Sequence, residues 1–188
     1  MPPNRKMKSY NFVLVLTGVS EPDDTVEDAL FEAGCDDAIL AFRNGVAYLE
    51  FDRRAISLEA AILSAVRNVE RAKHPVAVSH VEPDDLVNAS EIARRLEYTR
   101  EYVRLLVRGE RGEGGFPTPL AGVTGTAFLW SWATVLRWLL EHERLDDESQ
   151  LAQAETIRDI NSALRVRLHP SVRERHQTLL RKLQRGGK

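Results

Sequence analysis

Cysteine and long apolar runs are what this sequence most clearly lacks. Its 188 residues include a single cysteine, Cys35, so no disulfide can form within the chain. No stretch approaches the roughly 18 consecutive apolar residues that a membrane-spanning helix requires, and the basic start is not followed by the apolar core of a signal peptide. We therefore expect a cytoplasmic protein without a membrane partner, in which Cys35 is a buried structural thiol.

Residue patterns that bind metals or perform catalysis are also missing. No His and Cys spacing is typical of a metal site, and the loops of the first 82 residues contain neither a glycine-rich phosphate loop nor a histidine near a nucleophile. The pairs Asp23-Asp24 and Asp36-Asp37 are better explained as helix caps and loop acids than as metal ligands. His169 and His176 are interpreted as surface or packing residues. We expect no cofactor, no metal and no enzymatic activity.

A large excess of positive charge, which most nucleic-acid-binding proteins show, is absent as well. The chain has 26 Lys and Arg residues against 28 Asp and Glu residues, a net charge of −2 at pH 7. Residues 1–80 carry 9 basic against 12 acidic side chains, whereas residues 144–188 carry 10 against 6. Between residues 86 and 140, 7 arginines stand against 5 glutamates. DNA binding by this segment would therefore depend on where the arginines point.

Residues 9–82 alternate between strand-like and helix-like patterns. The strand-like runs are 10–16, 38–42, 46–51 and 75–81, and the amphipathic helical runs are 24–33 and 58–69. Asp24 and Ser57 are the expected N-caps of the two helices, and Asn44-Gly45 favours a tight hairpin turn. This order predicts an α+β fold that begins with a ferredoxin-like βαββαβ domain. The fold alone does not decide whether that domain senses a ligand, holds a dimer or binds a partner protein.

A polar joint, Glu82-Pro83-Asp84-Asp85, separates this domain from a second one at residues 86–143. Asn88 and Thr99 are the predicted N-caps of two short helices, which a turn at Glu97-Tyr98 connects. Two short helices joined by a tight turn predict a helix-turn-helix.

The second of these helices, residues 100–108, has two distinct faces. Val103, Leu106 and Val107 are expected to point inward. Arg100, Glu101, Arg104 and Arg108 lie on the opposite side, where the three arginines recur every four residues and form one ridge. Such a ridge is suited to the major groove of DNA, although a solvated helix face with Arg and Glu pairs has the same pattern.

The segment that follows is rich in glycine and tryptophan. A glycine-rich turn at 109–115 and an extended stretch at 116–119 precede a predicted hairpin, 120–130. Ser131 is expected to cap the next helix. The three tryptophans Trp130, Trp132 and Trp138 are better explained by packing in a small core than by stacking on bases.

Five ordered motifs between Leu86 and about His142 carry a family resemblance: "ASEIARRL", "TREYVRLLV", "FPTP", "FLW" and "VLRWL". With them the segment resembles the winged helix-turn-helix of the MerR superfamily, most closely its excisionase and AlpA-like branch. The resemblance implies that the helix matching Thr99–Val107 reads the major groove and that the hairpin forms a wing on neighbouring backbone. It also implies base or phosphate contacts from Thr99, Arg100, Tyr102 and Arg104, with Ser90 near the backbone and Thr124 and Thr126 at the wing.

The residues themselves add Glu101, Arg108 and Arg111 to this set. Glu101 and Arg108 share the outward face, and Arg108 and Arg111 offset the two glutamates of the glycine-rich turn. The predicted DNA-binding residues are Ser90, Thr99, Arg100, Glu101, Tyr102, Arg104, Arg108, Arg111, Thr124 and Thr126.

The remaining residues, 148–185, predict a C-terminal helical hairpin. Leu151, Ala154, Ile157, Ile160, Leu164 and Leu168 lie near one face of its first helix, 148–168. Val172, His176, Leu179 and Leu183 are expected to mark the inner side of the second helix. This hairpin either folds back on its own chain or pairs with a second copy.

Two functions remain open from the sequence. The first is a dimeric bacterial transcriptional regulator that binds double-stranded DNA, with an N-terminal domain that senses a partner or holds the dimer. The second is a protein-interaction adaptor or antitoxin-like module whose acidic N-terminal domain binds a partner protein. Salt dependence distinguishes them, because contacts to several phosphates weaken steeply as ionic strength rises.

Overall fold

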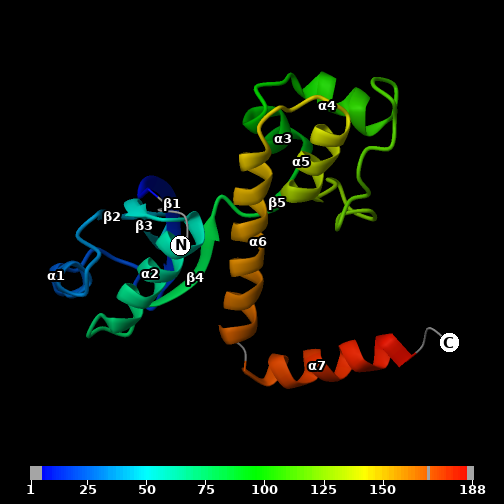
Figure 1. Ribbon diagram of the computed structural model, residues 1–188. Coiled ribbons are helices and arrows are strands. Elements are labelled where there is room, and N and C mark those ends of the chain that lie inside the picture. Colours follow the sequence, from blue (N-terminus) through cyan, green and yellow to red (C-terminus); the bar gives the residue numbers. More distant parts are fainter. Residues whose placement is uncertain (1–5, 169, 186–188) are drawn as a thin grey trace, which may run out of the picture. The chain divides into compact units, whose positions relative to one another are not determined.

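The computed structural model describes residues 6–168 and 170–185, and it confirms the α+β class. Seven helices and a four-stranded antiparallel sheet lie within these residues (Figure 1). The chain divides into a first unit, Met1–Pro83 with Asp159–Lys188, and a second unit, Asp84–Arg158. His169 lies outside the described residues, and the side chain of His176 is not described.

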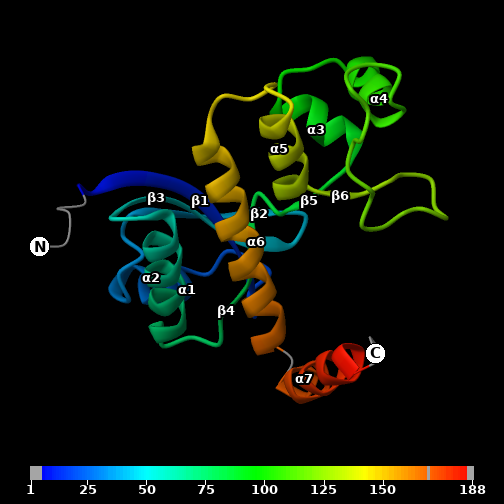
Figure 2. The same ribbon diagram turned by 45° about the vertical axis from the view of Figure 1, so that its right-hand side comes forward.

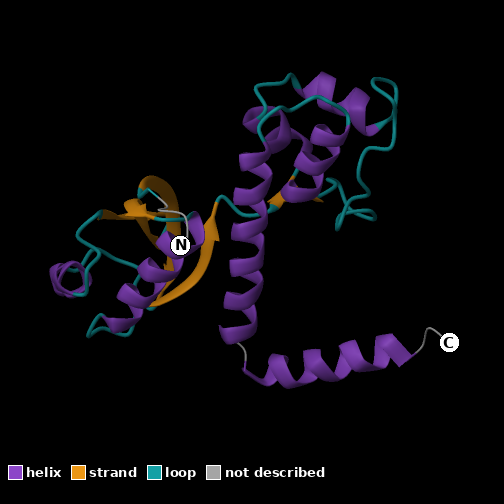
Figure 3. Cartoon of the chain, viewed as in Figure 1, coloured by secondary structure: helices purple, strands orange, loops and turns teal. Residues whose placement is uncertain are grey.

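The first unit begins with the element order that the sequence predicts. Its elements are β1 (Lys8–Thr17), α1 (Asp24–Glu32), β2 (Ala38–Arg43), β3 (Val46–Ala55), α2 (Leu58–Arg71) and β4 (Ala77–Glu82). The four strands pair in the order β2-β3-β1-β4, and every pairing is antiparallel. Figure 3 draws the strands in orange.

One face of this sheet forms the core of the first unit. Phe12, Leu14 and Leu16 alternate along β1 and are buried, as are Leu49 and Phe51 on β3. Helices α1 and α2 cover this face (Figure 2), and α2 buries an apolar stripe that matches its 3.6-residue period. Within residues 6–83, the described part of this stretch, no helix lies on the opposite face of the sheet (Figure 2).

The structure confirms two local features that the sequence predicts, the helix cap at Ser57 and the tight turn at Asn44-Gly45. Ser57 accepts a hydrogen bond from the backbone N–H of Ala60 at 3.1 Å and so caps α2. Asn44 and Gly45 have φ angles of 53° and 76°, which the tight turn between β2 and β3 requires. For α1 the prediction of Asp24 was wrong by one residue, because the carboxylate of Asp23 accepts from the N–H of Thr25.

A buried ion pair changes the interpretation of Asp37. Arg53 is only 7% exposed, and its Nε donates to Asp37 Oδ2 at 2.8 Å while NH2 donates to the carbonyl of Gly34 at 2.7 Å. Asp37 therefore compensates a buried guanidinium and is not a solvated loop acid. Cys35 is buried as predicted, and desolvation raises the pKa of its thiol to about 11.

Helix α6 (Glu148–Leu168) contributes residues to both units, and its later part supports the first unit. The side-chain amide of Asn161 accepts from Val81 N–H at 2.7 Å and donates to Val81 C=O at 2.9 Å. It thereby satisfies backbone groups of the edge strand β4. Ile160 and Leu164 are buried, as the stripe on this helix predicts.

Helix α7 (Pro170–Arg185) forms, but its predicted inner side is open where the structure describes it. Leu179 is 48% exposed and Leu183 is 77% exposed. Helical periodicity reveals an apolar stripe without identifying what covers it. These leucines do not fold back onto the described part of their own chain, and their pairing with a second copy stays a prediction.

The second unit is mostly helical. It contains β5 (Leu86–Val87), α3 (Ala89–Arg95), α4 (Arg100–Val107), β6 (Trp130–Ser131), α5 (Trp132–Glu141) and the first part of α6. Strands β5 and β6 form a two-stranded antiparallel sheet. The buried side chains of α3, α4 and α5 form one core with Val87 and Ala154.

Candidate nucleic-acid interface

Helices α3 and α4 start at the two residues that the sequence predicts. The side chain of Asn88 accepts from the N–H of Glu91 at 2.9 Å, and the hydroxyl of Thr99 accepts from the N–H of Tyr102 at 3.1 Å. Between the helices, Glu97 has a φ angle of 55°, which reverses the chain within a few residues. Local capping chemistry thus determines both ends of the turn that aims α4.

Helix α4 has one buried and one open side. Val103 and Leu106 are buried and Val107 is half-buried, so the inward side is as predicted. On the other side Arg100 and Arg108 are exposed, and 42% of the Arg104 side chain remains accessible. The arginine ridge of α4, defined as Arg100, Arg104 and Arg108, is therefore available to a ligand.

Acidic neighbours neutralise part of the arginine ridge. Arg104 donates from Nε to Glu101 at 2.7 Å, and Arg108 lies 3.7 Å from Glu110. Within the described residues, Arg100 has no acidic partner. Pairs as exposed as these contribute little to stability, so a phosphate can compete for the guanidinium groups.

A groove of about 440 Å³ connects α4 with the loop that precedes β6. It brings together four of the predicted DNA-binding residues, Ser90, Arg104, Arg108 and Thr126. Asn88, Ala89, Val107, Ala127, Phe128 and Trp130 complete its lining. Phe128 was not among the predicted site residues, and it is 43% exposed at this groove. Its one signal in the sequence is its place in the FLW motif.

Other predicted residues lie outside this groove. Arg100 lines a separate hollow of about 450 Å³ with Ser90, Arg94 and Tyr98 among its neighbours. Thr99 and Glu101 are exposed on α4, and Thr124 is exposed in the loop.

Tyr102 and Arg111 take part in the packing of the second unit. The Tyr102 hydroxyl accepts a 2.7 Å hydrogen bond from Arg144 NH1, and its ring meets Tyr98 edge to face at 4.9 Å. The guanidinium of Arg111 lies over the same ring at 5.2 Å. Tyr102 therefore anchors α4 from its half-buried side.

The predicted hairpin at 120–130 is reduced to a minimal pairing. Ala121 and Leu129 form an isolated bridge, in which Leu129 N–H donates to Ala121 C=O at 3.0 Å. A Cβ atom at Gly122 would lie 1.9 Å from the carbonyl oxygen of Ala127, so only glycine fits there. The tight, glycine-containing loop leaves too few paired residues for two regular strands.

Asp85 belongs to the core of the second unit, and its assignment to a polar joint was wrong. It is 7% exposed, its carboxylate accepts from Ala133 N–H at 2.8 Å, and its carbonyl accepts from Trp132 N–H at 2.6 Å. Together with Ser131, which caps α5 as predicted, it satisfies backbone donors at the start of that helix.

The tryptophans occupy the core, as predicted. Trp130, Trp132 and Trp138 are between 2% and 9% exposed. Trp130 donates from Nε1 to the carbonyl of Pro117 at 2.9 Å, which ties the extended stretch before the loop to β6. Phe116 contacts both Trp130 and Trp138 edge to face.

Glu91 joins the two arginines at the end of α3. Its carboxylate accepts from Arg94 Nε at 2.9 Å and from Arg95 Nε at 2.8 Å. The pKa of Glu91 is lowered from 4.5 to about 2. The hydrogen bond from Arg94 is the largest cause, and the hydrogen bond from Arg95 lowers it further.

This low pKa predicts an acid-sensitive contribution to stability. Because the folded-state pKa lies below the unfolded value, the Glu91 carboxylate stabilises the fold above pH 4.5, and this contribution is lost as the pH falls toward 2. We expect Glu91→Gln to lower the free energy of unfolding by about 1–2 kcal/mol at pH 7. Urea unfolding of variant and parent at pH 7 and pH 3 measures this difference in unfolding free energy. A gap between variant and parent that does not shrink at pH 3 would contradict this assignment.

Comparison with protein-family models finds no match, and comparisons with curated proteins and with solved structures find none either. Within residues 6–168 and 170–185, no three His, Cys, Asp or Glu side chains are grouped to hold a metal ion. None of the helices in those ranges combines the length and apolarity needed to cross a membrane.

Proposed function

We propose that the protein is a cytoplasmic, homodimeric DNA-binding regulator in which α4 reads the major groove. The observation that carries this proposal is the open arginine ridge of α4 beside a groove that also contains Ser90 and Thr126. Arginine side chains bind guanine edges and phosphates, whereas hydroxyl groups such as those of Ser90 and Thr126 bind phosphate oxygens.

The dimensions of α4 are compatible with this role. It has 8 residues. An α-helix with its side chains is about 10–12 Å across, which matches the major-groove width of about 12 Å. The tight turn at Glu97 and the cap at Thr99 present the first turn of α4, with Arg100, at one end of the open surface. Recognition helices contact base edges mainly through their N-terminal residues.

At the level of the fold, we propose a helix-turn-helix with a short wing, preceded by a ferredoxin-like domain. The strand order β2-β3-β1-β4 with two helices on one face supports the ferredoxin-like domain. The bridge between Ala121 and Leu129, next to the β5-β6 pair, supports the short wing. The resemblance to the MerR superfamily remains a proposal that rests on the five sequence motifs.

The steepness of the salt dependence tests DNA binding directly. If the three ridge arginines and their neighbours neutralise about three phosphates, a plot of log K against log salt has a slope near −3. Fluorescence anisotropy with a labelled duplex from upstream of the protein's own gene, at several salt concentrations, measures this slope. A slope near zero would show that the protein contacts no phosphates and would contradict the proposal.

The adaptor or antitoxin-like alternative is favoured by one observation. Two of the three ridge arginines already have acidic partners, Glu101 and Glu110, and the net charge of the chain is −2. Affinity capture from lysate with and without nuclease separates the two functions. A protein partner that is retained after nuclease treatment, together with no retained DNA, favours the alternative.

A further inference from the structure

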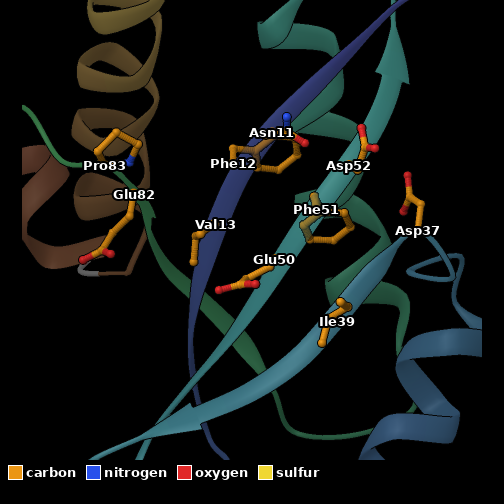
Figure 4. Close-up of a pocket in the computed structure, with 10 residues that line it drawn as sticks. All are labelled: Asn11, Phe12, Val13, Asp37, Ile39, Glu50, Phe51, Asp52, Glu82 and Pro83. Atoms are coloured by element: carbon orange, nitrogen blue, oxygen red, sulfur yellow. The ribbon is translucent and has the colours of Figure 1, made fainter. Parts of the chain in front are cut away.

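The helix-free face of the sheet in the first unit is open and partly apolar. Ile39 on β2 and Val46 on β3 are 68% and 47% exposed, and Val13 and Val15 on β1 are half-buried. A hollow of about 580 Å³ lies over this face, with Val13, Ile39, Glu50 and Glu82 on its lining (Figure 4). Exposed apolar side chains that share one sheet face favour an interaction surface.

Strand register arranges this face into two central rows. The acceptor row crosses the sheet as Ile39, Glu50, Val13 and Glu82, and the donor row beside it is Ala41, Tyr48, Val15 and His80. Each row has apolar side chains on β2 and β1 and polar ones on β3 and β4. The acceptor row contributes two carboxylates, and the donor row contributes a hydroxyl and an imidazole.

We propose that this face is the homodimer interface, with a second copy of the chain packed face to face and its strands running antiparallel to those of the first. A two-fold axis perpendicular to the strands places the donor row of each copy opposite the acceptor row of the other. Val13 then meets Val15 of the second copy, and Glu50 and Glu82 meet its Tyr48 and His80. The same patch is complementary to itself, as an isologous interface requires.

The outer rows fit the same arrangement. Asp52 lies next to the acceptor row on β3 and falls opposite Val46 of the second copy, whereas Arg43, which pairs with Val46, lies next to the donor row on β2. The two-fold axis therefore places Asp52 diagonal to Arg43 of the second copy, with opposite charges on neighbouring strands. Arg54, beyond Asp52, falls opposite the Asn44-Gly45 turn. With the axis parallel to the strands, Glu82 would instead face Ile39 of the second copy, which would bury a carboxylate against an apolar side chain.

The size of the face predicts a modest affinity. Four strands about 4.8 Å apart and about 20–25 Å long give a footprint of roughly 400–500 Å² per copy, below the ~800 Å² per partner of standard interfaces. We therefore expect dissociation in the micromolar range. This inference rests on the proposed function, because a dimeric DNA-binding protein reads two half-sites.

Charge substitutions at Val15 test the proposal without DNA. Val15→Glu places a carboxylate opposite Val13 of the second copy, between its Glu50 and Glu82, whereas Val15→Lys places an ammonium there. Sedimentation velocity of the full chain across roughly 1–200 µM should show a reversible dimer for the parent. We expect the dimer dissociation constant of Val15→Glu to be at least about tenfold higher than that of the parent. The dissociation constant of Val15→Lys should stay within about threefold of the parent value. Both variants should retain the parent's urea midpoint.

Three results would overturn the proposal. They are a parent that remains monomeric at 200 µM, equal effects of Glu and Lys at position 15, and a Val15→Glu dimer as tight as that of the parent. The last result would place the dimer contact on another surface of the chain. Because no DNA is present, failure here leaves DNA binding by a monomer untested, and failure of DNA binding leaves the interface standing.

Discussion

Replacing Arg100 and Arg104 together by alanine is expected to weaken binding to the upstream duplex at least about tenfold, because a bidentate arginine contact contributes about 1–3 kcal/mol. Arg100 has no acidic partner in the described part of the chain, and Arg104 is half-open beside the groove. Both side chains point away from the core, so the unfolding midpoint should stay within the range of ordinary surface substitutions. Anisotropy titrations at fixed salt measure the affinity.

Arg137→Ala is the matched control for this double variant. Arg137 is an exposed arginine of the same unit, but it lies on α5 and pairs with Glu155 on α6. Its loss should change DNA affinity less than about twofold, since it belongs to neither of the hollows beside α4. If the double variant bound DNA as tightly as the parent, α4 would not be the recognition helix.

Trp130→Ala is expected to give the largest loss of stability, about 3–5 kcal/mol. The side chain is 2% exposed, contacts Phe116 and Phe128, and donates a hydrogen bond to Pro117 C=O. Its removal leaves a cavity and an unpaired carbonyl in the small core of the second unit. Urea unfolding followed by circular dichroism measures the change.

Phe128→Ala provides the contrast, because Phe128 is 43% exposed at the groove and meets the Trp130 ring edge to face. It should cost about 1 kcal/mol or less of stability. The opposite outcome for Trp130→Ala, lost DNA affinity with unchanged stability, would assign this tryptophan to base stacking and contradict its place in the core.

The parts of the fold that follow from neighbouring residues could be predicted from the sequence. Asn88, Thr99, Ser131 and Ser57 cap the helices that the sequence assigns to them, because a cap needs only the side chain and the next few N–H groups. The Asn44-Gly45 turn also depends on two adjacent residues. For the same reason, the inward and outward faces of α4 follow from helical periodicity.

Contacts between distant residues could not be predicted in this way. Asp85 binds Ala133, 48 positions away, and Asn161 binds Val81, 80 positions away. Both residues are polar and occur in segments that resemble surface sequence, so composition gives no signal of their burial. Tyr102 shows the same limit at the candidate site, because its bond to Arg144 depends on how α4 packs against the chain after α5.

The most direct test of DNA binding through α4 is a map of the amides that respond to DNA. Proton-nitrogen correlation spectra of the full chain, recorded with and without the upstream duplex, provide it. If α4 reads DNA, the largest shifts fall on residues 99–108 and 124–128, and the sheet of the first unit changes little. Shifts confined to the first unit, or none at saturating duplex, would contradict the assignment of α4 as the helix that reads DNA.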